Sequence, residues 1–284
     1  MIKVLSDSTC DLSPDLLERY DIGIIPLYVR LGDEEHLDGV DITPDEIFEW
    51  SDRVGETPKT AAPSMGMIMD HFSKYLDAGD QLVVFTISSS MSSSYNNCCI
   101  AAEELDAEDI IRVIDSENLS TGVGLLVIEA ALMAKRGCSL DEIETRIKEL
   151  RPLVRASFVV DTLVYLHRGG RCSGLAAMLG GALKLHPRIA VSGGAMSPGQ
   201  KYRGKPQKFV MDYVQDMEAD LKKARPERVF ITHSGCDEDV VDTVREYLRS
   251  LDRFAEVLET RAGSVISSHC GPGTLGVLFI AEEN

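Results

Sequence analysis

Short apolar runs rich in β-branched residues alternate with helical stretches along the whole chain. Such runs, bounded by turn residues, are typical of buried strands. The runs expected to form strands are residues 2–5, 24–27, 81–87, 110–114, 157–160, 229–232, 255–258 and 275–281. Because strands and helices alternate, the pattern predicts an α/β fold with mostly parallel sheets that are covered by helices on both faces.

Polar positions between these runs mark where helices begin and end. Thr43 is followed by a proline and then by Glu46, which is the pattern of a helix N-cap with a capping box. Ser139 and Glu142 repeat the pattern, and Gly137 is placed to end an apolar helix that begins near residue 121.

The chain is expected to divide into two α/β domains, residues 1–152 and 153–284. The boundary is placed near Arg151, where the second of two charged helices ends and a new strand-like run begins. A length of 284 residues suits two ordinary domains. Since no low-complexity linker joins the halves, they should pack tightly with a cleft between them.

Composition narrows the classes of function. The sequence is 44% hydrophobic and 26% charged, as in folded globular proteins, and its formal net charge is −17. A surface that acidic repels phosphate backbones and anionic lipid headgroups, which disfavours nucleic-acid and membrane-surface roles. A small apolar ligand is not disfavoured, because it would be bound in an interior pocket.

The protein is expected to be cytoplasmic, without stable membrane insertion. The N-terminus lacks the basic region of a signal peptide. The longest apolar stretch, residues 122–133, contains Glu129 and is shorter than the ~20 residues that span a bilayer. The seven cysteines lack repeated spacing and are expected to be reduced thiols. No paired Cys or His motif indicates a structural metal site, and no cofactor is expected.

Two matches to nucleotide-binding motifs are interpreted as accidental. Residues 199–205 follow the phosphate-binding loop pattern, but Pro206 stands where a hydroxyl would bind magnesium. Residues 271–276 spell the glycine fingerprint of dinucleotide-binding folds, yet they are expected to follow a helix and precede the last strand, which is the reverse of the required order. No nucleotide site is therefore expected in this chain.

A run of six serines within residues 88–94 is the strongest candidate for a ligand site. It follows an apolar strand and precedes a helix that begins near Tyr95. Hydroxyls and backbone N–H groups beyond the carboxyl end of a strand can bind an anion. Serines that only cap the helix and satisfy the hydrogen bonds of the loop are the alternative interpretation. Residues 7–9 and 115–117 form similar strand-end loops, each more typical of an Asx-type turn.

These segments, taken in order, resemble the motifs of the DegV family, the fatty-acid-binding subunits of bacterial fatty acid kinase. The resembling segments are residues 4–12, 25–27, 59–64, 88–96, 113–116, 169–171 and 269–274. Each is weak alone, but seven in the family's order over essentially the whole chain are specific. The sequence departs from the family at Ala61 and Ala62, where Ser and Gln are usual, and at Ser93 and Ser94, where Gly and Thr are usual.

The resemblance implies two α/β domains with a long-chain fatty acid, of the palmitate, stearate or oleate type, in a buried tunnel between and beneath them. At the matching positions, the hydroxyls of Thr60 and Ser92 and the backbone N–H of Ser93 would hold the carboxylate. His269 would belong to the same network. Residues 176–185, the helix from Val123, and Met65, Met67 and Met69 are candidates for the tunnel lining, although most would be ordinary core in any protein.

The resemblance also implies a partner. Arg171 and Arg203 match basic positions near the ligand head group, where they would serve a kinase. That kinase would be a dihydroxyacetone-kinase-like fatty acid kinase subunit, which uses ATP to form an acyl phosphate for phospholipid synthesis. The chain itself would then be a lipid-binding protein and not an enzyme.

Two other functions are compatible with the same residues. A serine-dependent acyl hydrolase would use Ser92 and His269 with Asp7 or Asp115. The sequence has no GxSxG motif, but catalytic triads are defined by geometry and not by motif. The other alternative is a carrier of a different apolar carboxylic acid, such as an isoprenoid acid or a hydroxy fatty acid.

Overall fold

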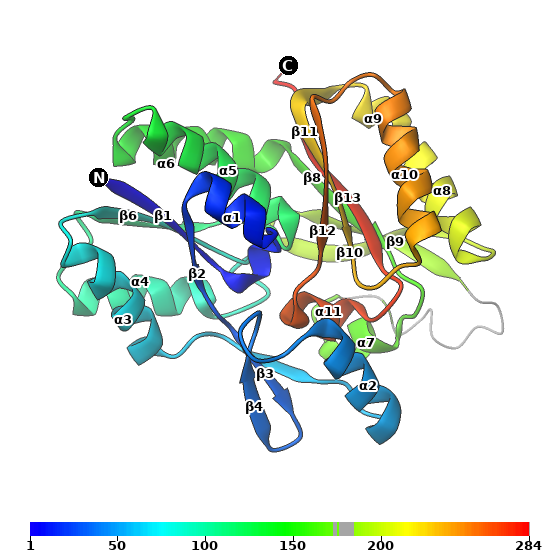
Figure 1. Ribbon diagram of the computed structural model, residues 1–284, viewed down its shortest axis with the longest axis horizontal. Coiled ribbons are helices and arrows are strands. Elements are labelled where there is room, and N and C mark those ends of the chain that lie inside the picture. The colour runs from blue at the N-terminus through cyan, green and yellow to red at the C-terminus, as the bar shows by residue number, and fades with distance from the viewer. Residues whose placement is uncertain (173–174, 176–184, 284) are drawn as a thin grey trace.

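The computed structural model describes residues 1–172, 175 and 185–283 (Figure 1). The N-terminal half is built on a parallel four-stranded sheet with the order β2-β1-β6-β7. Its strands are β1 (Ile2–Asp7), β2 (Ile22–Ile25), β6 (Gln81–Thr86) and β7 (Ile111–Asp115). The helices around it are α1 (Pro14–Tyr20), α3 (Met65–Leu76), α4 (Ser94–Glu104), α5 (Thr121–Lys135) and α6 (Leu140–Leu150).

Both faces of this sheet are buried, because successive side chains of a strand point to opposite faces. Leu82 and Val84 pack with the core that α3 and α4 provide, whereas Val83 and Phe85 pack with α5 and α6. The parallel order and the two helical layers confirm the α/β class for this half.

The second sheet has six strands in the order β10-β9-β8-β13-β11-β12. They are β8 (Val154–Val159), β9 (His186–Ser192), β10 (Ala195–Tyr202), β11 (Ala224–His233), β12 (Glu256–Arg261) and β13 (Leu275–Ala281). The helices α8 (Pro206–Asp216), α9 (Glu218–Leu221) and α10 (Glu238–Ser250) lie together on one side of it (Figure 1). The α/β class is confirmed here too.

The strand directions in the second sheet differ from the expected parallel arrangement. Only β11 and β12 pair in parallel, and the other neighbours are antiparallel. One cause is the connection between β9 and β10, which consists of Gly193 and Gly194 alone. A two-residue hairpin joins only antiparallel strands, and both glycines have the positive φ that such turns require.

A small antiparallel sheet, β4-β3-β5, projects from the N-terminal half beside α2 (Pro44–Val54) (Figure 1). Its strands are β3 (Tyr28–Leu31), β4 (Glu34–Leu37) and β5 (Lys59–Ala61). Helix α11 (Ser264–Cys270) of the C-terminal half packs against this sheet and α2, with Val265 in a shared core with Leu27 and Val29. This contact brings the two halves of the sequence together at the candidate site.

The predicted helix signals are confirmed. Thr43 with Glu46 and Ser139 with Glu142 each form a capping box, and Gly137 has a φ of 82° just beyond α5. The remaining short helices among the described residues are η1 (Ser8–Cys10), η2 (Arg151–Leu153) and α7 (Val164–Gly169). No helix in the described part of the chain is long and apolar enough to cross a bilayer.

Helix α5 lies between the two large sheets. Its residues share one core with Val4 and Phe85 of the first sheet and with Ala156 and Leu278 of the second. A helix that is apolar all round is expected in such a buried position. The division into domains at residues 152 and 153, where η2 leads into β8, stays a prediction.

Candidate ligand-binding cavity

A cavity of about 230 Å³ lies between the small sheet, the serine loop before α4, and α11. Residues from both halves of the chain line it. They are Leu27, Thr60, Ala61, Ala62, Ile87, Met91, Ser92, Ser93, Leu119, Arg171, Met196, Val265, Ile266, His269 and Cys270. A second cavity of about 20 Å³ shares three of these residues, Leu119, Ile266 and Cys270. The lining is mostly apolar and carries a few polar groups, which is the usual composition of a small-molecule site.

Thr60 and His269 form the central polar contact of the cavity. Strand β5 supplies Thr60, α11 supplies His269, and the threonine Oγ1 lies 2.8 Å from the histidine Nε2. The other ring nitrogen, Nδ1, is buried and has no hydrogen-bond partner among the described residues. The tautomer with hydrogen on Nε2 is favoured, because the other would bury an N–H group without an acceptor.

His269 is neutral at physiological pH. Burial, with a smaller contribution from the charge of Arg171, lowers the pKa of His269 to about 4. Gly169, at the end of α7, packs directly against the ring, since a Cβ atom at that position would lie only 2.4 Å from Nδ1. In the favoured tautomer, Thr60 accepts from Nε2–H and keeps its own O–H free to donate to a ligand.

Ser92 and Ser93 contribute the second polar edge of the cavity. The Ser92 Oγ lies 2.9 Å from the Ser94 Oγ and accepts from the Ser94 backbone N–H at 3.2 Å. Ser93 is the N-cap residue of α4, so its backbone N–H lies at the positive end of that helix. Hydroxyl and N–H donors at such a helix start suit an anionic group.

The rest of the serine run has a structural role. The Ser88 and Ser90 hydroxyls donate to the carbonyl oxygen of Gly194 at 2.7 and 2.5 Å, which ties the loop to the β9–β10 hairpin. Ser89 donates to the Asp115 carboxylate through its hydroxyl and its backbone N–H. These three serines therefore satisfy the loop, as in the alternative interpretation, and a ligand role for Ser92 and Ser93 stays a prediction.

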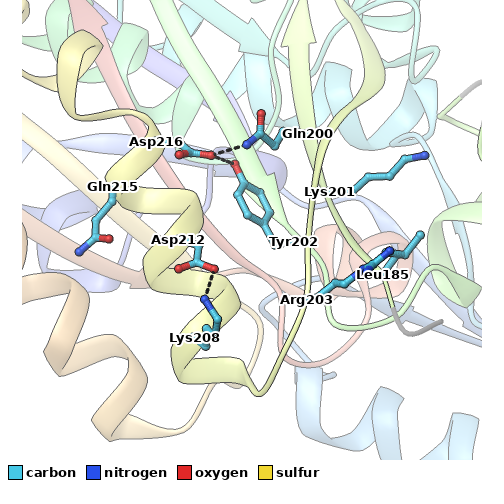
Figure 2. Close-up of a pocket in the computed structure, with 9 residues that line it drawn as sticks. All are labelled: Leu185, Gln200, Lys201, Tyr202, Arg203, Lys208, Asp212, Gln215 and Asp216. Carbon is cyan, nitrogen blue, oxygen red and sulfur yellow. Dashed lines mark hydrogen bonds and ion pairs between the residues drawn. The ribbon is translucent and has the colours of Figure 1, made fainter.

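Of the two predicted arginines, only Arg171 lies at this cavity. Its side chain is exposed and donates to the carbonyl oxygen of Gly169 at 2.6 Å. Arg203 lies in a separate, open surface pocket of about 680 Å³ (Figure 2). There, Lys208 pairs with Asp212 at 2.7 Å, and other polar side chains hold Asp216. The structure thus brings Thr60, Ser92, Ser93, His269 and Arg171 together and leaves Arg203 apart.

A hydrolase triad is not assembled in this geometry. His269 Nε2 contacts Thr60 and not Ser92, and no carboxylate among the described residues holds its Nδ1. Asp7 is buried and accepts from Thr9 and from the backbone N–H of Ile87. Burial raises the pKa of Asp7 to about 6. Asp7 thus holds the start of the serine loop and does not orient a catalytic base.

The candidate tunnel-lining residues that the structure describes lie away from this cavity. Val123 packs in the core around α5, and the three methionines of α3 pack against the core beneath the first sheet; none of them borders the cavity. Residues 176–184 lie outside the described residues, and Leu185 borders the surface pocket of Figure 2.

The apolar lining residues that sequence reasoning missed flank the polar motifs. Ile87 and Met91 flank and interrupt the serine run, and Val265 and Ile266 lie one turn before His269 in α11. Proximity to a motif was the only signal available for them. In the described part of the chain, no group of three His, Cys, Asp or Glu side chains is placed to hold a metal ion.

Comparison with known proteins places this chain in a family. A family model described as "Uncharacterised protein, DegV family" matches residues 1–282. A DegV domain-containing protein of Clostridium perfringens is 32% identical over 281 residues, covering 99% of each chain.

Solved structures give the same result. A DegV family protein from Thermus thermophilus, described by its fatty acid binding, superposes with a TM-score of 0.91 at 31% identity over 99% of both chains. A stearic-acid-binding protein from Eubacterium ventriosum superposes with a TM-score of 0.85 at 29% identity, over 99% of this chain and 98% of that one. The chain therefore belongs to the DegV family.

Proposed function

We propose that this chain binds a long-chain fatty acid in the 230 Å³ cavity, with the carboxylate at Thr60, Ser92 and Ser93. The observation that carries the proposal is a neutral Thr60–His269 pair together with the Ser92 hydroxyl in a mostly apolar cavity. The relatives from Thermus thermophilus and Eubacterium ventriosum, described as binding fatty acid and stearic acid, support the same ligand class.

Neutral donors suit a carboxylate in such a place. A buried ion pair would cost the desolvation of two charges, whereas with hydroxyl and amide donors the carboxylate is the one charge that is desolvated. A hydrogen bond to a charged acceptor contributes about 1.5–3 kcal/mol. Thr60, Ser92 and the Ser93 N–H offer three such donors, and the exposed Arg171 adds a positive charge nearby.

The acyl chain supplies the remaining affinity. Each buried CH₂ group contributes about 0.8 kcal/mol, so a long chain offsets the loss of translational and rotational freedom on binding. Leu27, Ile87, Leu119 and Ile266 offer apolar walls for it, and the second cavity behind Leu119 and Ile266 extends the apolar space.

The bound carboxylate would be the substrate of a separate, dihydroxyacetone-kinase-like fatty acid kinase subunit that uses ATP. Transfer of the γ-phosphoryl group to a carboxylate oxygen gives an acyl phosphate for phospholipid synthesis. The two nucleotide-like motifs of this chain do not compete with that assignment: residues 199–202 belong to β10, and residues 271–274 form the turn between α11 and β13. The exposed Arg171 and Arg203 are candidates for contact with the kinase.

Mass spectrometry of lipid extracted from the purified, denatured protein tests the ligand class. We expect a long-chain fatty acid at near-stoichiometric amounts, since an apolar cavity of this kind should fill during expression. A different apolar carboxylic acid in the extract would replace the fatty acid in the proposal. An empty extract, together with no uptake of added palmitate, stearate or oleate, would refute the carrier function.

A further inference from the structure

Two buried carboxylates hold the start of α11, the helix that carries His269. Asp11 accepts from the Gly263 backbone N–H at 2.8 Å, and Asp38 accepts from the Ser264 backbone N–H at 2.7 Å. Gly263 is the N-cap residue of α11 and Ser264 its first residue. Both aspartates come from the N-terminal half and are nearly inaccessible to solvent, with 5% and 2% exposed.

The second oxygen of each carboxylate accepts from a serine hydroxyl that lies beside a lining residue of the cavity. Asp38 accepts from the Ser8 hydroxyl at 2.7 Å, and the same Ser8 oxygen accepts from the backbone N–H of Leu27 at 3.1 Å. Leu27 lines the cavity. Asp11 accepts from the Ser120 hydroxyl at 2.5 Å, next to the lining residue Leu119.

The backbone around these carboxylates is strained and tightly packed. Asp11 has a φ of 50°, and Ser120 combines a φ of 53° with a ψ of −145°. Such conformations are unfavourable in residues other than glycine and persist only where the surroundings enforce them. A Cβ atom at position 263 would lie 3.1 and 3.2 Å from the Asp38 and Asp11 oxygens, so glycine permits this close approach.

We propose that Asp11 and Asp38 are positioning residues for His269. Neither borders the cavity, but together they fix the first turn of α11 and thereby place His269 at Thr60. A helix of seven residues has few internal hydrogen bonds, so its position depends on tertiary contacts of this kind. This inference rests on the proposed function, because its functional test measures the binding of a carboxylate.

The test compares Asp11→Asn and Asp38→Asn with Asp15→Asn, which removes an exposed carboxylate from the first turn of α1. Each aspartate accepts hydrogen bonds through both of its oxygens. Asparagine accepts through one oxygen only, so the substitution disrupts one of the two contacts. We expect palmitate affinity of the delipidated protein to fall roughly tenfold to hundredfold in Asp11→Asn and Asp38→Asn. Affinity for hexadecanol, which has the same chain without the carboxylate, should change much less. Asp15→Asn should bind both ligands like the unmodified protein.

The pKa of His269, followed by NMR of its ring, gives a readout that needs no ligand. The loss of a negative charge cannot by itself raise the pKa of His269, because negative charge favours the protonated ring. A pKa that rises from about 4 toward the ordinary value in Asp11→Asn and Asp38→Asn therefore reports displacement of the ring into water. If an asparagine variant fails to fold, Ser8→Ala and Ser120→Ala replace it. Each removes the serine hydroxyl that donates to one of the two carboxylates.

Three outcomes would overturn the positioning role. They are unchanged palmitate affinity with an unchanged His269 pKa, an equal loss of palmitate and hexadecanol binding, or the same effects in Asp15→Asn. If the unmodified protein binds no fatty acid, the proposed function fails, whereas a raised His269 pKa in the variants would still support the positioning of α11.

Discussion

At the residue scale, the chemistry of the cavity depends on groups that stay uncharged. His269 is neutral because it is buried beside Arg171, and Gly169 leaves room for its ring. In the proposed function, Thr60 and Ser92 would meet a ligand carboxylate as hydroxyl donors. The proposed role of Thr60 was predictable only through the family motifs, because a threonine in a three-residue strand carries no local sign of a ligand, whereas Ser92 lies in a serine run that itself indicated an anion site.

Removing either hydroxyl should weaken fatty-acid binding. We expect Thr60→Ala and Ser92→Ala each to lower the affinity for palmitate roughly tenfold to hundredfold, because each loses a hydrogen bond to a charged acceptor. Calorimetric titration of the delipidated protein measures this effect. Ser93→Ala is the matched control, since it keeps the backbone N–H and should bind nearly as the parent does. Parent-like affinity in both hydroxyl variants would place the head group elsewhere.

The lowered pKa of His269 predicts a pH-dependent contribution to stability. The unfolded histidine binds a proton near pH 6.5, whereas the folded one does so only near pH 4, so the free energy of unfolding should fall as the pH drops through this interval. Asp7 has the opposite effect: its folded pKa of about 6 exceeds the unfolded value of 3.8, so its contribution grows as the pH falls through that range.

His269→Gln separates the two effects, because it removes the histidine titration and leaves Asp7 in place. Urea unfolding of both proteins between pH 7.5 and 4.5 gives the comparison. The unfolding free energy of the parent minus that of the variant should decrease as the pH falls. A difference that is independent of pH would mean that His269 titrates alike in the folded and unfolded states.

At the element scale, the helix caps were predictable from the sequence, whereas the pairing of the short and antiparallel strands was not. The capping boxes of α2 and α6 follow from side chains three residues apart, which the sequence displays directly. Strands β3, β4 and β5 have only three or four residues each and are held by their neighbours in space. Strand β10 contains Pro198 and Gly199, which are poor strand formers, and it pairs with β9 through a glycine hairpin and an irregular register.

The β9–β10 hairpin also closes over the serine loop, and this contact can be tested at Gly194. A Cβ atom there would lie 2.8 Å from the Ser88 Oγ, and the φ of 79° disfavours any other residue. Gly194→Ala should destabilise the protein by more than about 1 kcal/mol. Gly193→Ala is the matched control, because it has a positive φ of 54° but no neighbour within 4 Å.

Urea unfolding gives both values. A larger loss in Gly194→Ala than in Gly193→Ala measures the contact between the hairpin and the serine loop. Equal losses in the two variants would show that only backbone strain matters and that the serine hydroxyls do not hold the hairpin.

At the scale of the whole molecule, one core joins the two large sheets through α5, and the cavity lies where the small sheet meets α11. The alternation of strands and helices was enough to predict the α/β class. It was not enough to predict the antiparallel part of the second sheet or the lining of the cavity. A ligand cavity and an ordinary core are lined by the same kinds of apolar residue. The sequence therefore does not distinguish Leu119, which borders the cavity, from Met65, which does not.

A crystal structure of the protein with bound palmitate tests the central claim most directly. We predict that the carboxylate oxygens lie within hydrogen-bond distance, about 2.5–3.2 Å, of the Thr60 and Ser92 hydroxyls. The acyl chain should run along Leu119 and Ile266. A palmitate carboxylate in the open pocket at Arg203, or an acyl chain outside the cavity altogether, would contradict the account.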